Sequence, residues 1–396
     1  MIRRDNYLKK IIGYRGKKII KVITGIRRCG KSTLLEMYKN YLIDDGVTEN
    51  SIVSINFDDM RNADLLDYKV LYSHLDEKVG EGFYTIILDE IQNVENFQFV
   101  VNSLFLRDNV DIFITGSNAY MLSGELATYL SGRYIEINVL PLSFREFVIH
   151  KGMSDNLQKA YRQYIELGSF PYLLQLDDTS QIQEYLRGIY STVVLKDILS
   201  RNKIGDVMML ESIISFMLDN IGNIVSTKKI SDTMTSLGRK INVRTVESYL
   251  TALVESYILY EVKRYDVKGR QHLKTLGKYY VVDIGFRNLL LGNKGLDIGF
   301  VLENIVYLEL IRRGYSVFIG KVGLLEIDFV VSKGNEYKYY QVSASVRDSS
   351  TLERELKSLR AVSDSYEKFV LTLDDDPVRD YDGIKVMNVL DFLVEN

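Results

Sequence analysis

The sequence predicts an α/β protein whose N-terminal part is a parallel β-sheet covered by helices. Five apolar, β-branched runs predict strands at residues 18–24, 51–57, 83–89, 110–115 and 134–139. Segments long enough for a helix separate them, and residues 33–42 place leucines and tyrosines at helical spacing. Strands that alternate with helices form parallel sheets with both faces covered.

The composition is that of a soluble chain with several domains. Its 396 residues exceed what one hydrophobic core usually supports, and 46% hydrophobic with 26% charged residues is an ordinary globular balance. No apolar run reaches the ~18 residues that span a bilayer, and the N-terminus lacks the apolar stretch of a secretory signal. We therefore expect a cytoplasmic protein with no membrane partner. The single cysteine, Cys29, excludes a disulfide framework and a zinc site built from cysteines.

A glycine-rich motif follows the first predicted strand. Residues 25–33 match G-x-x-x-x-G-K-[ST] and precede a predicted helix. Gly25 and Gly30 permit backbone angles that turn successive N–H groups toward one anion, and a helix N-terminus favours the same charge. Lys31 is expected to reach the β- and γ-phosphates of ATP, and Ser32 to offer its hydroxyl to Mg²⁺. The other cofactor-binding positions of the loop are Arg28, Cys29 and Thr33, with Cys29 interpreted as a small, oxidation-sensitive filler.

Two acids end the third predicted strand. Four apolar or β-branched residues, 85–88, precede Asp89 and Glu90. Asp89 is expected to hold the water shell of Mg²⁺, and Glu90 to polarise the attacking water as general base. Alone, the pair could be two solvated loop acids. After a phosphate-binding loop, it indicates hydrolysis of ATP to ADP.

Beyond these two motifs the chain resembles AAA+ ATPases, and among them a family of prokaryotic AAA-type ATPases with a C-terminal domain of unknown function. The resemblance covers nearly the whole chain. It rests on residues 25–33, on Leu-Asp-Glu-Ile-Gln at 88–92, and on the segments 114–118, 130–133 and 168–171. It implies a P-loop NTPase core in 1–142, a helical lid in 143–203, a winged-helix domain in 204–292 and a restriction-endonuclease-like α/β domain in 293–396.

The resemblance also implies roles for four further residues. Ser117 and Asn118 match a polar sensor at the end of the fourth strand, with Ser117 the first choice; a plain helix cap is the alternative. Arg133 matches an arginine finger that enters a neighbour's site in a homo-oligomer and stabilises charge on the γ-phosphate. A local salt bridge is its alternative. Pro171 belongs to a Gly-Ser-Phe-Pro segment similar to the signature that places a lid against the adenine ring, one residue longer here, or to an ordinary helix-breaking turn.

The middle of the chain is basic. Residues 226–278 carry eleven lysines and arginines against five acids, in a chain of net charge −3. Helices at 227–237 and 243–256, followed by strands at 257–265 and 279–283 around a basic loop at 268–274, have the order of a winged helix. Such a domain binds double-stranded DNA through its second helix, or serves as a protein-interaction module with a solvated basic face. The expected phosphate contacts are Lys228, Lys229, Arg239, Lys240, Arg244, Lys268 and Arg270.

The last part predicts a helix at 302–313 and strands at 316–319, 326–331 and 337–342. Its resemblance to restriction endonucleases matches Glu303, Glu326 and Asp328 to acids that hold Mg²⁺. Gln341 and Ser343 stand where the remaining acid and the lysine are expected, which predicts lost nuclease activity. The three acids then bind a weak metal or only stabilise the fold.

Together these features predict a Mg²⁺-dependent ATPase that couples ATP hydrolysis to conformational change and, through the winged helix, acts on DNA. The rival interpretation is a slow nucleotide-dependent switch that binds a protein partner and no DNA. A third, an ATP-assisted nuclease, is disfavoured by Gln341 and Ser343.

Overall fold

The computed structural model describes residues 2–119, 129–130, 132–199, 204–273, 276–292 and 297–395. The chain forms two compact units: Met1–Leu140 with Glu255–Tyr257, and Pro141–Val254 with Ile258–Asn396. The three domains expected beyond residue 142 fall within the second unit, and their division stays a prediction. Ser131 and Lys274, which belong to two of the sequence motifs, lie outside the described residues. None of the helices described is long and apolar enough to cross a membrane.

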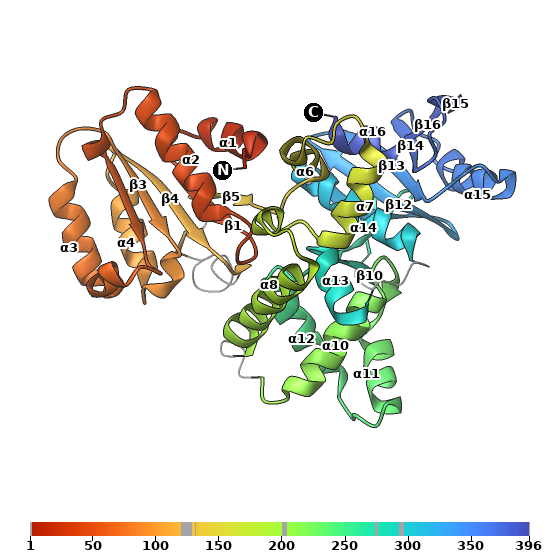
Figure 1. The fold of residues 1–396 in the computed structure, drawn as a ribbon, viewed down its shortest axis with the longest axis horizontal. Coiled ribbons are helices and arrows are strands. Elements are labelled where there is room, and N and C mark those ends of the chain that lie inside the picture. The colour runs from red at the N-terminus through yellow and green to blue at the C-terminus, as the bar shows by residue number, and fades with distance from the viewer. Residues whose placement is uncertain are drawn as a thin grey trace. The chain divides into compact units, whose positions relative to one another are not determined.

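The first unit is built on a five-stranded parallel sheet (Figure 1). Its strands lie in the spatial order β2-β3-β4-β1-β5, and every neighbouring pair is parallel. They are β1 (Ile20–Thr24), β2 (Ile52–Asn56), β3 (Tyr84–Asp89), β4 (Val110–Gly116) and β5 (Tyr134–Asn138). Each coincides with a predicted strand to within two residues at either end. The α/β fold class is thereby confirmed for this part of the chain.

Helices cover both faces of this sheet. Tyr38 of α2 packs on Phe113 of β4, with ring centroids 4.7 Å apart. The opposite face carries a core in which Leu71 of α3 and Val101 of α4 join Ile112. Successive strand residues point to opposite faces, so α2 lies on one side and α3 and α4 on the other. The helical elements, with η for 3₁₀ turns, are α1 (Asp5–Ile12), α2 (Lys31–Asp44), η1 (Glu49–Ser51), η2 (Met60–Leu66), α3 (Tyr68–Lys78), η3 (Ile91–Asn93) and α4 (Phe97–Phe105).

A buried ion pair joins the two central strands of the sheet. Lys21 of β1 and Asp111 of β4 are 0% and 2% exposed, and the ammonium is bonded to the carboxylate. Lys21 also donates to the carbonyl of Lys17 at 2.7 Å, and Asp111 accepts from the N–H of Gly16 at 2.8 Å. Burial lowers the pKa of Lys21, and the hydrogen bond with Asp111 opposes that shift. Each charge therefore depends on the other for its place in the core.

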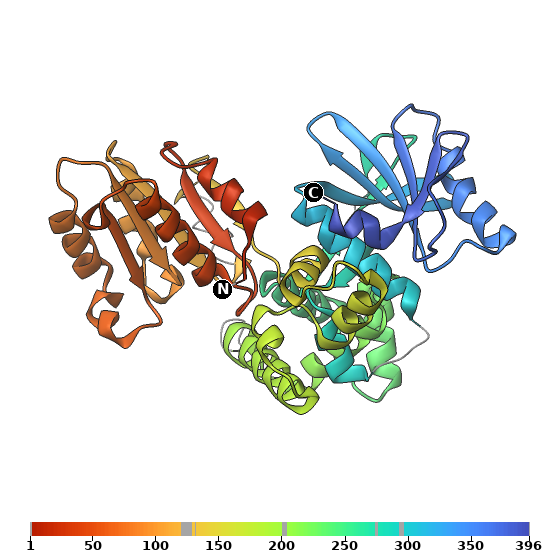
Figure 2. The same ribbon diagram turned by 45° about the horizontal axis from the view of Figure 1, so that its top comes forward.

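The second unit begins with the helices expected at 143–201, which Gly168–Pro171 interrupts as predicted (Figure 2). Further helices line the middle and the C-terminal segments. In chain order they are α6 (Phe144–Lys151), α7 (Leu157–Leu167), η5 (Pro171–Gln175), α8 (Thr179–Thr192), the π-helical η6 (Val193–Leu199), α10 (Val207–Asp219), α11 (Thr227–Ser236), α12 (Val243–Glu255), α13 (Ile284–Leu291), α14 (Ile298–Arg312), α15 (Ser349–Arg360) and α16 (Val389–Val394).

The strands of the middle segment differ from the prediction. Instead of one strand at 257–265 there are two, β7 (Leu259–Val262) and β8 (Arg264–Asp266). β7 pairs with β10 (Gly277–Val281) in the small sheet β6-β10-β7, where β6 is Ile224–Val225. β8 pairs in parallel with β11 of the large sheet, and β9 (Gln271–His272) pairs with β8. The loop at 268–270 is thus the turn of an edge hairpin on the large sheet, because β11 supplies the backbone partners of β8.

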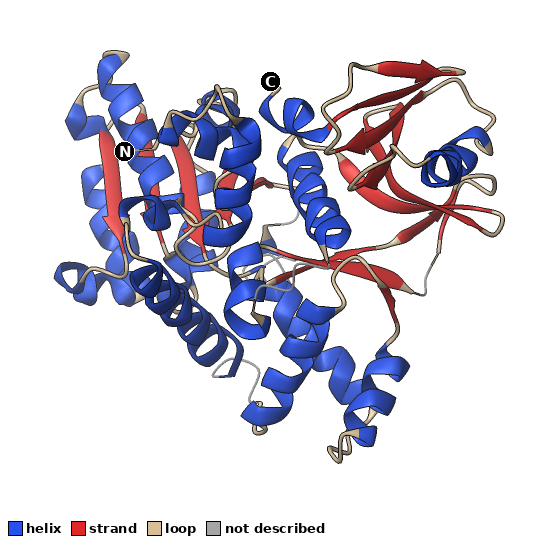
Figure 3. Cartoon of the chain, turned by 45° about the vertical axis from the view of Figure 1, so that its right-hand side comes forward, coloured by secondary structure: helices blue, strands red, loops and turns tan. Residues whose placement is uncertain are grey.

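The large sheet has the order β15-β16-β14-β13-β12-β11-β8-β9. Figure 3 shows the strands of the chain in red, with the strands of this sheet on the right. The predicted helix and three strands of the last part are present as α14, β11, β12 and β13. Leu356 and Leu359 of α15 pack into the core of this sheet, whereas α14 is buried along both its flanks from Val301 to Leu310. The strands are β11 (Ser316–Val322), β12 (Leu325–Lys333), β13 (Glu336–Ser343), β14 (Glu367–Thr372), β15 (Arg379–Tyr381) and β16 (Ile384–Asn388).

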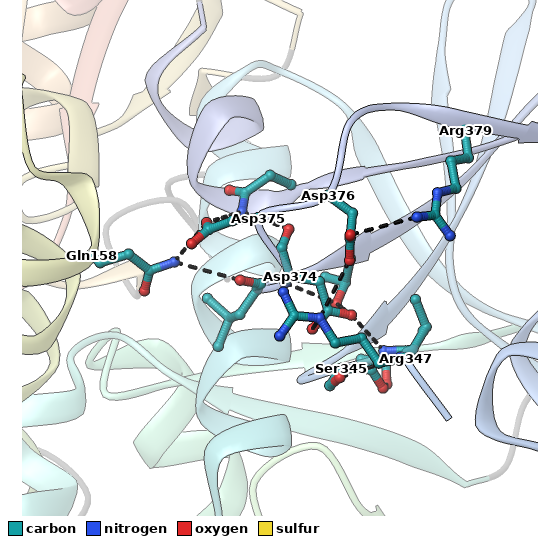
Figure 4. A network of polar contacts seen from close by, with 12 residues as sticks. Gln158, Ser345, Arg347, Asp374, Asp375, Asp376 and Arg379 are labelled. Atoms are coloured by element: carbon teal, nitrogen blue, oxygen red, sulfur yellow. Dashed lines mark hydrogen bonds and ion pairs between the residues drawn. The ribbon is translucent and has the colours of Figure 1, made fainter. Parts of the chain in front are cut away.

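A polar network ties helix α7 to the loop that follows β14 (Figure 4). Gln158 donates to Asp375 Oδ1 at 3.2 Å and to the carbonyl of Leu373 at 3.4 Å. The buried Asp374 accepts from the N–H of Val346 at 2.8 Å and lies 3.6 Å from the guanidinium of Arg347. The first helices of this unit and its C-terminal sheet are therefore linked by hydrogen bonds as well as by apolar packing.

Asp111→Ala tests the buried pair in the first unit. The change leaves the Lys21 ammonium in the core without its carboxylate, and we expect the free energy of unfolding to fall by about 3–5 kcal/mol. The double variant Lys21→Met, Asp111→Leu removes both charges and should recover most of that loss. Denaturant unfolding of the three proteins measures it, with Asp108→Ala, in an exposed pair with Lys18, as the control. A double variant as unstable as Asp111→Ala contradicts this account.

Candidate functional site

The phosphate-binding loop predicted at 25–33 lies between β1 and α2. Gly25 has φ +138°, and a Cβ there would lie 2.2 Å from the carbonyl oxygen of Val139, so no other residue fits. Gly30, the N-cap of α2, has φ +103°, and the exposed Arg28 has φ +66°. Alternation between left-handed and right-handed backbone conformations along the loop turns successive N–H groups to one side. With the N-terminus of a 14-residue helix behind it, the loop is an anion cradle.

Lys31 lies inside this loop and contacts the acid pair. It is 4% exposed, and its ammonium donates to the carbonyls of Gly25 at 3.0 Å and Ile26 at 3.4 Å. The same ammonium is 3.5 Å from Glu90 Oε1. The structure therefore brings together the lysine of the loop and the predicted general base, which lie 59 positions apart in the sequence.

Asp89 is held at the end of β3 by two neighbouring strands. Thr115 of β4 donates its hydroxyl to Asp89 Oδ1 at 2.5 Å, and Asn56 of β2 donates its amide to Oδ2 at 2.9 Å. Burial raises the pKa of Asp89, and hydrogen bonds from Thr115 and from Ser32 oppose the shift. Ser32 and Asp89, the two predicted Mg²⁺ ligands, thus lie side by side. Sequence reasoning missed these roles of Thr115 and Asn56, although both residues lie at or next to the last position of a predicted strand.

Glu90 adopts a conformation that is rare outside glycine. Its φ and ψ are 56° and 44°, and its N–H donates to the hydroxyl of Thr115 at 2.8 Å. Gln92 donates its amide to Glu90 Oε2 at 2.5 Å. Burial opposes ionisation of the carboxyl, but the ammonium of Lys31 and the Gln92 amide outweigh it, so the pKa of Glu90 lies below its ordinary value. A strained backbone and a fixed side chain are typical of a positioned reactive group.

The two candidate sensor residues follow β4. Ser117 and Asn118 are 1% and 3% exposed. The hydroxyl of Ser117 favours the ionised form of Glu90 without the geometry of a full hydrogen bond. The structure therefore brings Ser117 to the acid pair, as a sensor requires. The sensor role itself stays a prediction, and so does its alternative, a helix cap, because residues 120–128 lie outside the described residues.

The N-terminal helix also contributes to the loop, which the sequence motifs did not indicate. Arg4, 2% exposed, donates to the carbonyl of Cys29 at 3.0 Å and to that of Leu140 at 2.7 Å. The hydroxyl of Tyr7, on α1, accepts a hydrogen bond from the N–H of Leu140, two residues after β5, at 3.1 Å. Cys29 is fully buried, and burial raises the pKa of its thiol. It is a packing residue of the loop, and a thiol in this state is a poor target for oxidation.

Arg133 lies at the end of the strands opposite the phosphate-binding loop. It precedes β5, whose first residue Tyr134 pairs with Ile20 at the start of β1, whereas the phosphate loop follows the end of β1. Its guanidinium is bonded to Asn102 of α4 and lies 5.7 Å from the ring of Phe105. Arg133 cannot reach its own chain's loop, so a finger role could operate only on a neighbouring copy. Its described contacts are local, but they are with an amide and an aromatic ring, and so neither is the salt bridge expected as the alternative.

The turn at Gly168–Pro171 packs within the second unit. Ser169 donates both its N–H and its hydroxyl to the buried Asp283, and Phe170 packs on Phe286 with centroids 5.2 Å apart. Gly168 has φ +89°, and a Cβ there would lie 2.7 Å from Asp283 Oδ1. Burial raises the pKa of Asp283, which these donors partly offset. The turn thus anchors the start of α13, and the contact of Pro171 with adenine stays a prediction.

The three C-terminal acids do converge, but on a lysine. The ammonium of Lys278, on β10, lies 2.9 Å from Glu303, 2.9 Å from Glu326 and 3.8 Å from Asp328. Burial and the neighbouring charge of Glu303 raise the pKa of Asp328 to about 8. Among the described residues, no three His, Cys, Asp or Glu side chains are arranged to hold a metal ion. The amide of Gln341 is likewise engaged, donating to Glu355 Oε2 at 2.7 Å.

The basic residues of the middle segment fall into separate groups. Lys278 is buried and therefore contributes nothing to an exposed basic surface. The two cations of the β8–β9 turn lie at the edge of the large sheet, on a hairpin between β7 and β10 in the sequence. Of the seven expected phosphate contacts, six are exposed and Arg239 is half-buried. The exposed ones are Lys228 and Lys229 on α11, Lys240 and Arg244 near the start of α12, and Lys268 and Arg270.

Comparison with known proteins agrees with this geometry. A family model described as an AAA domain matches residues 17–148, and one described as a domain of unknown function matches residues 158–297. An uncharacterised protein of Haemophilus influenzae is 40% identical over 400 residues, covering 100% of this chain and 99% of the relative. The chain belongs to a family of AAA-domain proteins. An uncharacterised member from Methanocaldococcus jannaschii is 30% identical over 401 residues, covering 96% of this chain and 83% of that one.

A solved structure supports the fold of this AAA-domain protein. The Walker-type ATPase PABY2304 of Pyrococcus abyssi superposes with a TM-score of 0.50 at 15% identity, covering 73% of this chain and 96% of that one. The five-stranded parallel sheet with its loop and acid pair is therefore a P-loop ATPase fold. Arg4, the N-cap of α1, and the helix itself precede the residues matched by the AAA-domain family model.

Arg4→Ala tests the contribution of α1 to the loop. Losing a charged donor to the carbonyl of Cys29 should loosen the loop and weaken ADP binding about tenfold, the equivalent of one such hydrogen bond. Calorimetric titration with ADP measures the affinity, and a thermal melt checks that the variant is folded. Arg3→Ala removes a neighbouring arginine that is 82% exposed and should leave the affinity unchanged. Equal affinities for Arg4→Ala and wild type would show that the loop needs no support from α1.

Proposed function

We propose that this AAA-domain protein binds ATP with Mg²⁺ and hydrolyses it, and that hydrolysis drives a conformational change of the second unit. One observation carries the proposal. Lys31, Asp89 and Glu90 lie together at the ends of β1 and β3, directly behind a loop whose backbone is shaped for phosphate. A catalytic lysine, a metal-binding acid and a base within one hydrogen-bonded group are what phosphoryl transfer requires.

The residues present fit a magnesium ion. Mg²⁺ prefers oxygen ligands and is usually held by one or two carboxylates together with substrate phosphates and water. Ser32 and Asp89 offer a hydroxyl and a carboxylate, and Thr115 and Asn56 orient the carboxylate from behind. The bound ion would neutralise charge between the β- and γ-phosphates. Ser32, exposed at the start of α2, and Asp89 would hold it.

Glu90 is suited to accept a proton from water. It is ionised at neutral pH because the nearby ammonium of Lys31 lowers its pKa, despite the burial that opposes ionisation. When phosphate enters the loop, Lys31 gains a second anionic partner, and its hold on Glu90 weakens. The carboxylate, still fixed by Gln92, would then be left to orient the attacking water.

The exposed cations of α11, α12 and the β8–β9 turn support double-stranded DNA as the partner acted upon. Lysines and arginines bind phosphates without sequence preference, and the binding weakens with salt. We infer a winged-helix-like domain in this segment from its helices and its small sheet, and a nuclease-like domain without activity from the large sheet. Assembly into a homo-oligomer would let Arg133 act on a neighbouring copy.

The alternative function is a slow nucleotide-dependent switch that binds a protein and no DNA. A groove of about 480 Å³ between α10 and α11 favours it. Met208 and Leu237 in its wall are 62% and 68% exposed, and Phe216 and the buried Met234 also line it. Arg239, one of the proposed phosphate contacts, lines the same groove.

Steady-state phosphate release by Glu90→Gln tests the ATPase. Losing the general base should lower turnover by about 10²–10⁴-fold, while ATP binding persists because the loop is unchanged. Glu95→Gln, an exposed acid five positions further on, serves as the control. Lys31→Ala should lose both binding and turnover. Full activity of Glu90→Gln would remove Glu90 from the mechanism.

Charge reversal of Lys228, Lys229 and Arg244 separates the two functions. If DNA is the partner, wild type binds a duplex in a salt-dependent manner, duplex stimulates its phosphate release, and both effects disappear in the reversed variant. Fluorescence anisotropy of a labelled duplex at several salt concentrations measures binding. Reversal of Lys9, Lys10 and Lys17 in the first unit is the matched control. Turnover indifferent to duplex, with no salt-dependent binding, would favour the switch.

A further inference from the structure

The first compact unit includes three residues from far along the chain, Glu255–Tyr257. The residues on either side of them, Val254 and Ile258, belong to the second unit. Tyr257 lies in the turn between α12 and β7 and is only 6% exposed. It falls within the segment matched by the domain of unknown function. The unit that carries the phosphate-binding loop therefore buries a side chain that comes from outside its AAA domain.

The backbone of Tyr257 has a conformation that is normally left to glycine. Its φ is +59°, and the N–H of Ile258 bonds to the carbonyl of Leu253 at 3.1 Å. A bond of this span around a left-handed residue ends a helix, and glycine is favoured there because it has no Cβ. Among the described residues, four other helices end with the same bond, and each has glycine at the left-handed position: Gly46 after α2, Gly152 after α6, Gly238 after α11 and Gly314 after α14. Tyrosine at this position of α12 is strained, which points to a use for its side chain.

The side chain of Tyr257 contacts the base of the phosphate-binding loop. Its hydroxyl donates to Glu136 Oε1 at 3.2 Å, and the same oxygen accepts the hydroxyl of Thr24 at 2.6 Å. Asn138 donates its amide to Thr24 Oγ1 at 3.3 Å. Thr24 is the fully buried last residue of β1 and directly precedes Gly25 of the loop. Two hydrogen bonds thus join the α12–β7 turn to the residue from which the loop starts.

This connection is suited to transmit a small movement. Gly25 lies so close to the carbonyl of Val139 that the start of the loop has little freedom to adjust by itself. Burial and the neighbouring carboxylate of Glu136 raise the pKa of Tyr257, so the phenol stays protonated and remains a donor. A shift of Thr24 when nucleotide fills the loop is therefore passed through Glu136 to Tyr257.

We propose that Tyr257 is a positioning residue of the nucleotide site, and that nucleotide bound at the loop acts on helix α12 through its hydroxyl. The inference rests on the proposed function, because it requires nucleotide to occupy the loop. Arg244, one of the expected DNA contacts, lies near the start of the same helix. The segment of unknown function then supplies both a part of the nucleotide site and the helix that responds to it.

Tyr257→Phe removes the hydroxyl and keeps the ring. We expect the dissociation constant of ADP with Mg²⁺ to rise about fivefold, the net value of one hydrogen bond. In a Glu136→Ala background the same change should add less than about twofold, because the hydroxyl acts through that carboxylate. Calorimetric titration measures the four affinities. Tyr249→Phe, in an α12 tyrosine that is 7% exposed and belongs to the second unit, is the matched control and should bind ADP as wild type does.

Hydrogen exchange at saturating ADP separates this role from plain packing, because every variant then has its site filled. In wild type, ADP should slow the exchange of amides in residues 25–33 and also in residues 255–262. In Tyr257→Phe the loop should remain protected, while residues 255–262 exchange at their nucleotide-free rate. Tyr249→Phe should keep both responses.

Two kinds of result overturn the inference, and they differ in what they mean for the proposed function. If ADP protects the loop but wild type shows no response at 255–262, or Tyr257→Phe keeps that response, the loop binds nucleotide and Tyr257 does not transmit its binding. Additive losses of affinity in Tyr257→Phe and Glu136→Ala have the same meaning. If ADP leaves the loop itself unprotected in wild type, nucleotide binding fails, and the inference fails with it.

Discussion

The candidate ATPase site depends on the hydrogen bonds of a single hydroxyl, that of Thr115. It donates to Asp89 and accepts from the N–H of Glu90, so one side chain of β4 fixes both acids of β3. It can do so only because β4 lies next to β3 in the sheet, with β1 on its other side. The same order brings the loop after β1 to the acid pair, where Lys31 meets Glu90. Any other strand order would separate the lysine, the acids and the hydroxyl.

The second unit is held together by elements that pair with, or contact, segments distant from them in the sequence. The β8–β9 hairpin departs from the small sheet to extend the large one, and Lys278 of β10 inserts among acids of α14 and β12. Gln158 of α7 bonds the loop after β14. The helices, the small sheet and the large sheet consequently form one compact body. A nucleotide-driven movement is therefore expected to displace this body as a whole.

Two groups of acids in this chain each face a buried lysine, in different ways. Asp89 and Glu90 face a lysine whose ammonium also lies within reach of the phosphate loop, so that the charge can be shared with a ligand. Glu303 and its partners face an ammonium that belongs to the same unit and is held by all three of them. Under the proposed function, the first lysine can exchange a carboxylate for a phosphate, whereas the second is held by acids of its own unit and serves the structure.

The features that the sequence by itself determined are those that depend on local backbone conformation and short-range patterns. The positive φ of Gly25 and Gly30, the apolar runs of the five parallel strands and the acids at the end of β3 follow from short-range rules, and all lie where they were predicted. The packing of Arg4 on the loop and the bridging role of Thr115 depend on residues distant in the sequence. Only the tertiary structure decided these, together with the pairing of β8 and the place of Lys278, because partners in long-range contacts leave no periodic or local signal.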